Sequence, residues 1–167
     1  CIGGEIVRLL VDKQRHQSEH KSRHILSVTT LNRGRKYWRE FNSESYNTCN
    51  LQVDRTCEKA VREALFSRYP RRCVDVIIDC SGYRKSSVRS VLDSLQVLVQ
   101  YIYISTDSIY EVCACQSSQN QPTSEEDCLR PTDVSMRRAL ASEDKYGNKK
   151  KQCEEYLQRM CDDGVVP

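Results

Sequence analysis

The chain has 167 residues and a formal net charge of +3, from 26 basic and 23 acidic residues. This length suits one ordinary domain, and the near balance of charge gives no electrostatic argument for a nucleic-acid-binding protein. No run of apolar residues in the sequence approaches the length of a membrane span. The composition therefore excludes a membrane-spanning protein and points away from a strongly basic one.

Strands and helices alternate along the predicted chain. The hydrophobic pattern predicts strands at residues 25–31, 51–54, 74–79 and 101–105, and helices at residues 5–11, 57–69, 85–98 and 145–161. The apolar run at 74–79 is typical of a strand buried on both faces of a parallel sheet. Residues 35–50 are expected to form a surface excursion, and residues 111–143 are expected to hold a long loop. The alternation predicts an α/β fold with right-handed crossovers and a doubly wound parallel sheet.

Cysteine is abundant, with ten residues in the chain. Cys73, Cys80 and Cys153 lie in or beside apolar runs, where cysteine behaves as a small hydrophobe. No signal peptide is visible in the sequence, and the strand-helix alternation is that of an intracellular α/β protein. We therefore expect reduced thiols in a cytoplasmic protein.

Two groups of residues raise the question of a metal site. Cys113-Ala-Cys115 has a one-residue gap, which is not the usual zinc spacing. The second group comprises His16, His20 and His24. These histidines have helical spacing but lie in a very polar segment, typical of a solvated helix end or an insertion. The sequence therefore predicts no metal site.

A tyrosine and a lysine stand four residues apart on the last predicted helix. Tyr146 and Lys150 share one face, which continues through Cys153, Leu157 and Met160. Lys150 thus occupies a position where an apolar residue is expected. A buried ammonium beside a phenol lowers the pKa of the phenol and makes it a general acid or base near neutral pH. The alternative is a solvated lysine on a helix that also carries Lys145, Lys149 and Lys151.

Six short motifs follow one another in a recognisable order. They are Ile2-Gly3, Asn32-Arg33-Gly34, Asp54, Cys80-Ser81-Gly82, the stretch Tyr101–Tyr110, and Tyr146 with Lys150. Together they cover nearly the whole chain. The set resembles the extended short-chain dehydrogenase/reductases, in the NAD-dependent epimerase/dehydratase branch. The resemblance implies a Rossmann-like fold over residues 1–167.

The resemblance also implies a reaction, which is hydride transfer between a nicotinamide and a secondary alcohol or its ketone. Tyr146 would exchange the hydroxyl proton, and Thr106 would hydrogen-bond the same oxygen. Lys150 would hold the nicotinamide ribose and depress the pKa of the tyrosine. The substrate would be a hydroxylated molecule such as a nucleotide sugar.

The cofactor-binding residues implied by the resemblance come from four places in the chain. Gly3 would be the last glycine of the phosphate loop, beside the N-terminus of the first helix. Asn32 and Arg33 would bind the adenosine ribose, and Asp54 would bind the adenine amino group. Ser81 and Gly82 would contact the cofactor where the fourth strand passes it. Lys150 is the last of these residues. Arg33 follows a strand end that lacks a carboxylate, which favours NADP over NAD, unless Arg33 stacks on the adenine.

Three departures from the family pattern limit these expectations. Ser108 stands where dehydratases of this branch carry a glutamate, so an epimerase or reductase is expected instead. The first strand, the first two glycines of the phosphate loop and the C-terminal substrate-binding part have no counterpart. Since the first strand is central in such a sheet, its loss leaves a gap in the ladder. We therefore expect a fragment or splice product that binds cofactor poorly and does not fold independently.

Other functions on the same fold are a non-catalytic NAD(P)-binding or RNA-binding regulator and an inactive truncated isoform. The basic run Arg33–Arg39 favours the RNA-binding alternative. The resemblance also supports it, because some relatives in this branch with a comparable Asn-Arg-Gly strand end bind RNA. A solvated charged loop explains that run equally well. The retained Tyr146, Lys150 and Thr106 favour chemistry. The resemblance also implies a homodimer that pairs through helices 85–98 and 145–161.

Overall fold

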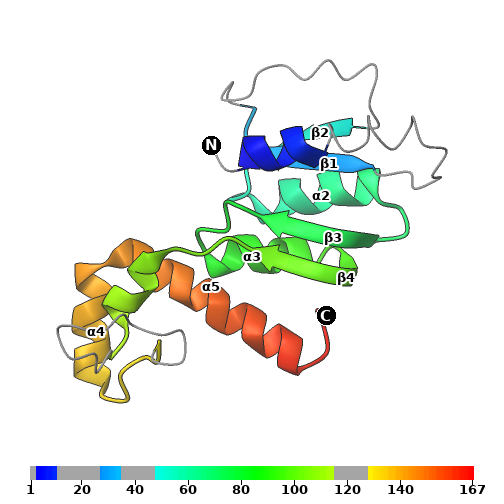
Figure 1. The fold of residues 1–167 in the computed structure, drawn as a ribbon. Helices are drawn as coiled ribbons and strands as arrows, with labels where there is room; N and C mark the ends of the chain where they lie inside the picture. The colour runs from blue at the N-terminus through cyan, green and yellow to red at the C-terminus, as the bar shows by residue number, and fades with distance from the viewer. Residues whose placement is uncertain (1–2, 11–26, 35–47, 115–127) are drawn as a thin grey trace. The chain divides into compact units, whose positions relative to one another are not determined.

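The computed structural model describes residues 3–10, 27–34, 48–114 and 128–167 (Figure 1). These residues form a mixed α/β structure with two small parallel sheets of two strands each. The chain divides into two compact units, Cys1–Arg68 and Tyr69–Pro167. The α/β class expected from the sequence is confirmed at this level.

The first unit contains one pair of strands and two helices. A helix over residues 3–10 precedes β1 (Val28–Asn32), β2 (Thr48–Gln52) and α2 (Glu58–Arg68). β1 and β2 are parallel, in register from Val28 opposite Thr48 to Asn32 opposite Gln52. Val61 and Leu65, one helical turn apart, are the buried residues of α2.

The predicted strand at residues 51–54 was misplaced, because β2 begins three residues earlier. Residues 48–50 had been assigned to the surface excursion on account of their polarity. In the structure the exposed Asn50 Oδ1 accepts hydrogen bonds from Thr30 Oγ1 and Asn32 Nδ2, both at 2.7 Å. The polar side chains therefore pair across the two strands. The rest of the excursion and the histidine segment lie outside the described residues.

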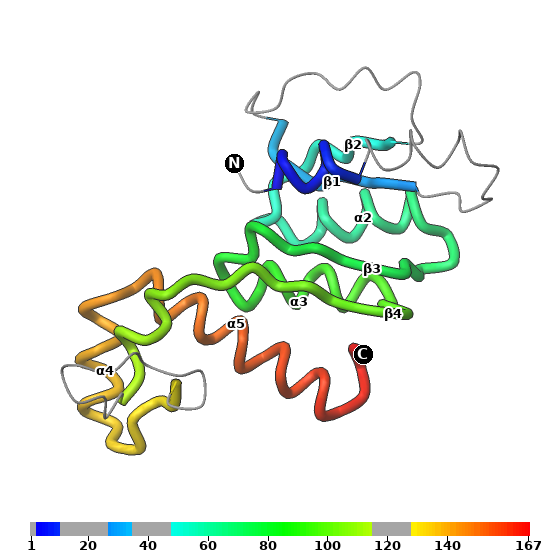
Figure 2. The backbone as a smooth tube through the Cα atoms, viewed as in Figure 1, coloured from blue at the N-terminus to red at the C-terminus, as the bar shows by residue number. Residues whose placement is uncertain are grey.

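The second unit contains the other strand pair. Its elements are β3 (Cys73–Asp79), α3 (Lys85–Leu92), β4 (Gln96–Tyr103), a 3-10 helix η2 (Asp107–Val112), α4 (Val134–Glu143) and α5 (Lys145–Asp162). β3 and β4 run side by side and parallel, from Cys73 opposite Gln96 to Asp79 opposite Tyr103 (Figure 2). The register shifts between Val74 and Val76. α3 and α5 pack together through Val88, Cys153 and Tyr156.

Two predictions about this strand pair were wrong. The helix predicted at 85–98 ends at Leu92, and residues 96–100 belong to β4, because they pair with β3. β3 is also not buried on both faces, since Val76 is 45% exposed. A sheet of two strands leaves positions such as Leu98 and Val99 exposed as well. The apolar run therefore indicated the strand but not its burial.

The long loop predicted at residues 111–143 contains a helix. α4 begins after Asp133, whose carboxylate caps the helix by accepting a hydrogen bond from the Met136 N–H at 2.7 Å. All residues of α4 are at least partly exposed, so no apolar stripe indicated the helix. Residues 115–127 of the predicted loop lie outside the described residues. The last helix was predicted correctly, apart from one additional residue at its end.

Candidate functional site

The central feature of the candidate site is a lysine buried at the end of β4. Lys150 is 1% exposed, and its ammonium donates a hydrogen bond to the Ile104 carbonyl oxygen at 2.5 Å. The same ammonium lies 4.1 Å from the centroid of the Tyr103 ring and 5.7 Å from that of Tyr83. Both distances suit a cation over an aromatic face. The prediction that Lys150 occupies an inward position is confirmed.

Tyr146 lies one helical turn before Lys150, at the start of α5. The Asp144 carboxylate caps this helix by accepting from the Tyr146 and Gly147 N–H groups, each at 2.9 Å. The predicted inward stripe needs a correction here, because Tyr146 is 45% exposed and Gly147 is the buried residue. The inward face of α5 is formed by Gly147, Lys150 and Cys153, so Tyr146 lies at the rim of that face.

A second tyrosine connects Tyr146 with the lysine. The ring of Tyr83 lies 6.0 Å from the ring of Tyr146 at an angle of 48°, and it also contacts the Lys150 ammonium. Tyr83 is 50% exposed. The sequence does not predict that Tyr83 belongs to the site, because nothing in the turn at 80–83 indicates which way its side chain points. A phenol pair at the rim above a buried ammonium is the most distinctive arrangement in the second unit.

Thr106 follows β4 and starts η2. Its Oγ1 accepts from the Ser108 N–H at 3.4 Å and donates to the Asp107 carboxylate at 3.1 Å. Ser108 in turn lies against α5, because a Cβ built on Gly147 would stand 2.1 Å from the Ser108 carbonyl oxygen. Thr106, Tyr146 and Lys150 are therefore all gathered around the segment that leaves β4. The structure brings these three predicted residues into one neighbourhood.

The turn after β3 is held by a buried carboxylate. Asp79, 4% exposed, accepts from the Ser81 N–H at 3.0 Å and from the Tyr101 hydroxyl at 2.8 Å. The Tyr103 hydroxyl donates to the Gly82 carbonyl oxygen at 2.6 Å, and burial raises the pKa of Tyr103, with its hydrogen bond to Cys153 as the next cause. The phenol therefore stays protonated and serves as a donor.

Ser81 and Gly82, both predicted to contact a cofactor, differ in exposure. Ser81 is exposed, whereas Gly82 is buried. A Cβ on Gly82 would lie 2.7 Å from the Asp79 carboxylate and 2.9 Å from Val88. The close approach at Gly82 is thus to the protein itself, and glycine is required there for packing.

The remaining predicted cofactor residues lie in the first unit. Gly3 is the first described residue of the helix over residues 3–10. Asn32 ends β1, and its Oδ1 accepts from the Gly34 N–H at 2.8 Å. Asp54 accepts from the Thr56 N–H at 2.9 Å and from its hydroxyl at 2.8 Å.

Arg33 and Asp54 share a small cavity. It has a volume of about 360 Å³ and is also lined by Gln52 and Val53. The lining of this cavity therefore includes one guanidinium and one carboxylate. The structure therefore brings these two predicted residues together.

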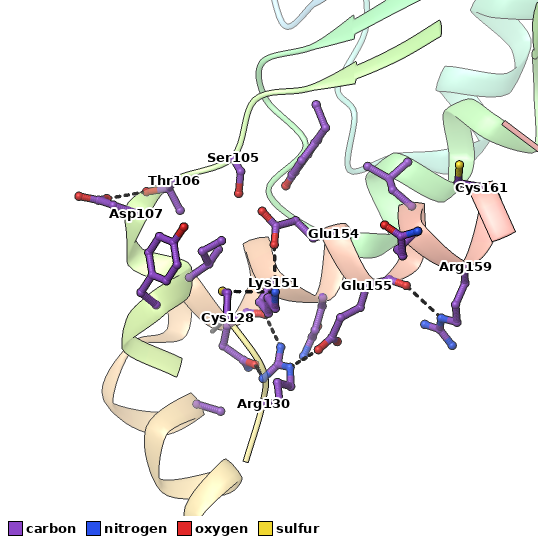
Figure 3. A pocket seen from close by; sticks show the side chains of 18 of the residues that line it. Ser105, Thr106, Asp107, Cys128, Arg130, Lys151, Glu154, Glu155, Arg159 and Cys161 are labelled. Atoms are coloured by element: carbon purple, nitrogen blue, oxygen red, sulfur yellow. Dashed lines mark hydrogen bonds and ion pairs between the residues drawn. The ribbon is translucent and has the colours of Figure 1, made fainter. Parts of the chain in front are cut away.

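The second unit has a larger cavity between η2 and α5, which we call the η2–α5 cavity. Its volume is about 1500 Å³, and its charged lining includes Arg130, Lys151 and Glu155 (Figure 3). Thr106 is the predicted catalytic residue that lines it. Arg130 donates to the Glu155 carboxylate at 2.5 Å and to Asn148 Oδ1 at 2.8 Å, which fastens the segment before α4 to α5.

Comparison of the chain with protein-family models, with curated proteins and with solved structures found no match. Within the described part of the chain, no group of three or more histidine, cysteine or acidic residues is arranged to hold a metal ion. None of the described helices has the length and apolar character needed to cross a membrane.

Proposed function

We propose that this chain is an NAD(P)-binding, cytoplasmic domain of epimerase or reductase type that acts on a hydroxylated, nucleotide-sugar-like substrate. The observation that carries the proposal is the burial of Lys150 at 1% exposure beside the end of β4, one turn after Tyr146. Lysine is almost never fully buried unless its charge is needed or paired. Leucine or methionine would fill the same space without the cost of removing an ammonium from water.

The proposal includes a Rossmann-like fold for this domain. In a Rossmann-like sheet the first strand separates the second and third strands from the fourth and fifth. The parallel pairs β1–β2 and β3–β4 support the proposal, because in that strand order the second and third strands are neighbours, and so are the fourth and fifth.

Each residue of the site has a proposed role. The exposed phenol of Tyr146 gives or takes the proton of the substrate hydroxyl, and the Thr106 hydroxyl donates a hydrogen bond to the same oxygen. Lys150 supplies a positive charge one helical turn from the phenol and holds a ribose hydroxyl. A bound nicotinamide supplies the hydride chemistry.

The adenosine end of the cofactor is assigned to the first unit. Arg33 pairs with a 2′-phosphate, which favours NADP over NAD, and Asp54 accepts from the adenine amino group. Asn32 reads the ribose, and Gly3 in the first helical turn leaves backbone N–H groups for the pyrophosphate. Ser81 is exposed beside the β3 turn and contacts the cofactor there, whereas the buried Gly82 shapes that turn.

The test is a fluorescence titration of NADPH and NADH into the full chain, with circular dichroism to verify folding. We expect weak, saturable binding that is tighter for NADPH. Arg33→Ala should remove the preference for NADPH, because the preference depends on the guanidinium. Asp54→Asn should weaken both cofactors alike.

Turnover is tested with a matched pair of tyrosine variants. Tyr146→Phe and Tyr83→Phe each remove one exposed phenol hydroxyl from the same ring pair. In a screen of nucleotide sugars with NADP⁺ or NADPH, Tyr146→Phe should abolish turnover and leave cofactor binding unchanged, whereas Tyr83→Phe should remain active. Tight RNA binding by a folded chain that ignores both cofactors would instead support the regulatory alternative.

A further inference from the structure

Two buried thiols face each other at the end of η2. Cys113, the C-cap of η2, is 7% exposed, and Cys128 is 5% exposed. Their sulfur atoms lie 3.3 Å apart. Cys113 also donates a hydrogen bond from its thiol to the Ile109 carbonyl oxygen at 3.1 Å. Neither cysteine is in a disulfide, so the contact joins two reduced sulfurs.

A lysine is directed at one of the two sulfurs. Lys151 Nζ donates to Cys128 Sγ at 3.4 Å and to the Glu154 carboxylate at 3.3 Å (Figure 3). The Lys151 side chain is 14% exposed. Burial is the largest single effect on the pKa of Lys151, and it lowers that pKa. The contacts with Cys128 and Glu154 together raise the pKa by more than burial lowers it, so the net shift is upward. The ammonium therefore remains charged beside the sulfur.

The two thiols differ in their access to small molecules. Cys128 and Lys151 line the η2–α5 cavity, whereas Cys113 belongs to the cluster it forms with Ile109 and Cys128. A small molecule in the cavity therefore meets the sulfur of Cys128 first. Cys113 does not line the cavity, and its sulfur contacts the sulfur of Cys128.

We propose that Cys113 and Cys128 form a reversible redox pair that exchanges with low-molecular-weight disulfides, with Cys128 as the attacking thiol and Cys113 as the resolving thiol. Cys128 loses its proton and attacks one sulfur of the external disulfide. The external S–S bond breaks, a mixed disulfide forms on Cys128, and the first external thiol leaves with a proton. Cys113 then loses its proton, attacks the Cys128 sulfur and releases the second external thiol.

The exchange balances, because two protein thiols are oxidised to one disulfide and one external disulfide is reduced to two thiols. A disulfide bond is about 2.05 Å long, so the two sulfurs need to approach by about 1.2 Å from their 3.3 Å separation. Oxidation ties η2, whose N-cap is Thr106, to the segment that Arg130 fastens to α5.

The experiment treats the full chain with a glutathione redox buffer, alkylates the remaining thiols and maps the products by mass spectrometry. We expect Cys113 and Cys128 to be linked to each other, with return to two thiols on reduction. Cys113→Ser should accumulate a glutathione mixed disulfide on Cys128, because the resolving thiol is gone. Cys128→Ser should leave Cys113 unmodified. Lys151→Met should slow mixed-disulfide formation in the Cys113→Ser chain more than Lys149→Met does.

The exposed Cys57 and Cys161 serve as internal references. The proposal is overturned if these react before Cys128, or if the mapped disulfide joins other cysteines. Equal glutathionylation of Cys113 and Cys128 in the two single variants would also overturn it, because the assignment of roles depends on the cavity. If a serine variant fails to fold, differential alkylation of the native chain gives the same ranking of reactivities.

Discussion

Lys150 donates its hydrogen bond to the carbonyl oxygen of Ile104, a residue 46 positions earlier in the chain, at 2.5 Å. This bond joins the middle of α5 to the end of β4. The stem of Lys150 is buried in the same place, so the side chain serves both as packing and as a charge. Its two contributions are separable by substitution.

We expect Lys150→Ala to lower the free energy of unfolding by about 2–4 kcal/mol, because it creates a cavity and removes the donor to Ile104. Lys150→Met keeps the volume of the stem and should cost only about 1 kcal/mol, while it weakens NADPH binding. Urea denaturation measures both values. The matched control is the exposed neighbour Lys149→Ala, expected within about 0.5 kcal/mol of the parent. An equal effect at the two positions would contradict the buried geometry.

Gly147 allows α5 to approach η2. Alanine there would place a Cβ 2.1 Å from the Ser108 carbonyl oxygen, so one backbone has to shift. We expect Gly147→Ala to destabilise the chain by about 1–3 kcal/mol, although alanine in an unhindered helix interior is favourable by up to about 1 kcal/mol. Thermal unfolding measures the difference.

Gly164→Ala is a useful reference for that variant. Gly164 has a φ of +69° and nothing within 4 Å of a built Cβ, so its substitution costs only backbone strain. We expect Gly164→Ala to cost less than Gly147→Ala. The reverse order would show that α5 and η2 are not in close contact.

Arg130, in the segment before α4, forms a partly buried ion pair with Glu155 of α5. Its side chain is 11% exposed, and it contacts both Glu155 and Asn148. Arg130→Ala should lower the free energy of unfolding by about 2–3 kcal/mol, because it leaves polar partners on α5 unsatisfied. The control is the exposed pair Arg89–Asp93, where Arg89→Ala should cost at most about 0.5 kcal/mol. Similar values for the two variants in a urea titration would refute the anchoring role of Arg130.

Asp133 makes α4 sensitive to acid. The Ser135 hydroxyl and the Met136 N–H hold the pKa of this exposed carboxyl below its usual range. Since the folded-state pKa is the lower one, the stabilisation is present above the unfolded-state pKa and is lost as the pH falls through the folded-state value. Protection of α4 amides from hydrogen exchange should therefore fall on acidification.

Two variants verify the cause of that pH dependence. Ser135→Ala should move the pKa of Asp133 back towards its usual range, because the hydroxyl is the largest contribution. Asp133→Asn should make the hydrogen-exchange protection of α4 independent of pH in the acid range. A carboxyl pKa measured by NMR that does not respond to Ser135→Ala would contradict the capping geometry.

The sequence located the well-patterned elements and missed those whose pattern was weak. The bounds of α5 follow from the Asp144 cap and the periodic inward face, and both are local signals. α4 was missed because all its residues are at least partly exposed, and the start of β2 was missed because its polar residues are stabilised by partners on β1. The end of α3 depends on pairing between β4 and β3, which no local pattern contains.

In the candidate site, too, local sequence patterns predict some features, whereas others depend on how the elements pack. Helical spacing alone put Lys150 on the inward face of α5, since that face is defined by the residues around it. Only the tertiary structure decided that the Ile104 carbonyl oxygen accepts the hydrogen bond of Lys150, that the Tyr83 ring lies beside the Tyr146 ring, and that Cys113 contacts Cys128. These contacts join residues far apart in the chain or depend on the direction of a side chain. The α/β class and the burial of the lysine were therefore determined locally, whereas the partners of each side chain depend on how the elements pack.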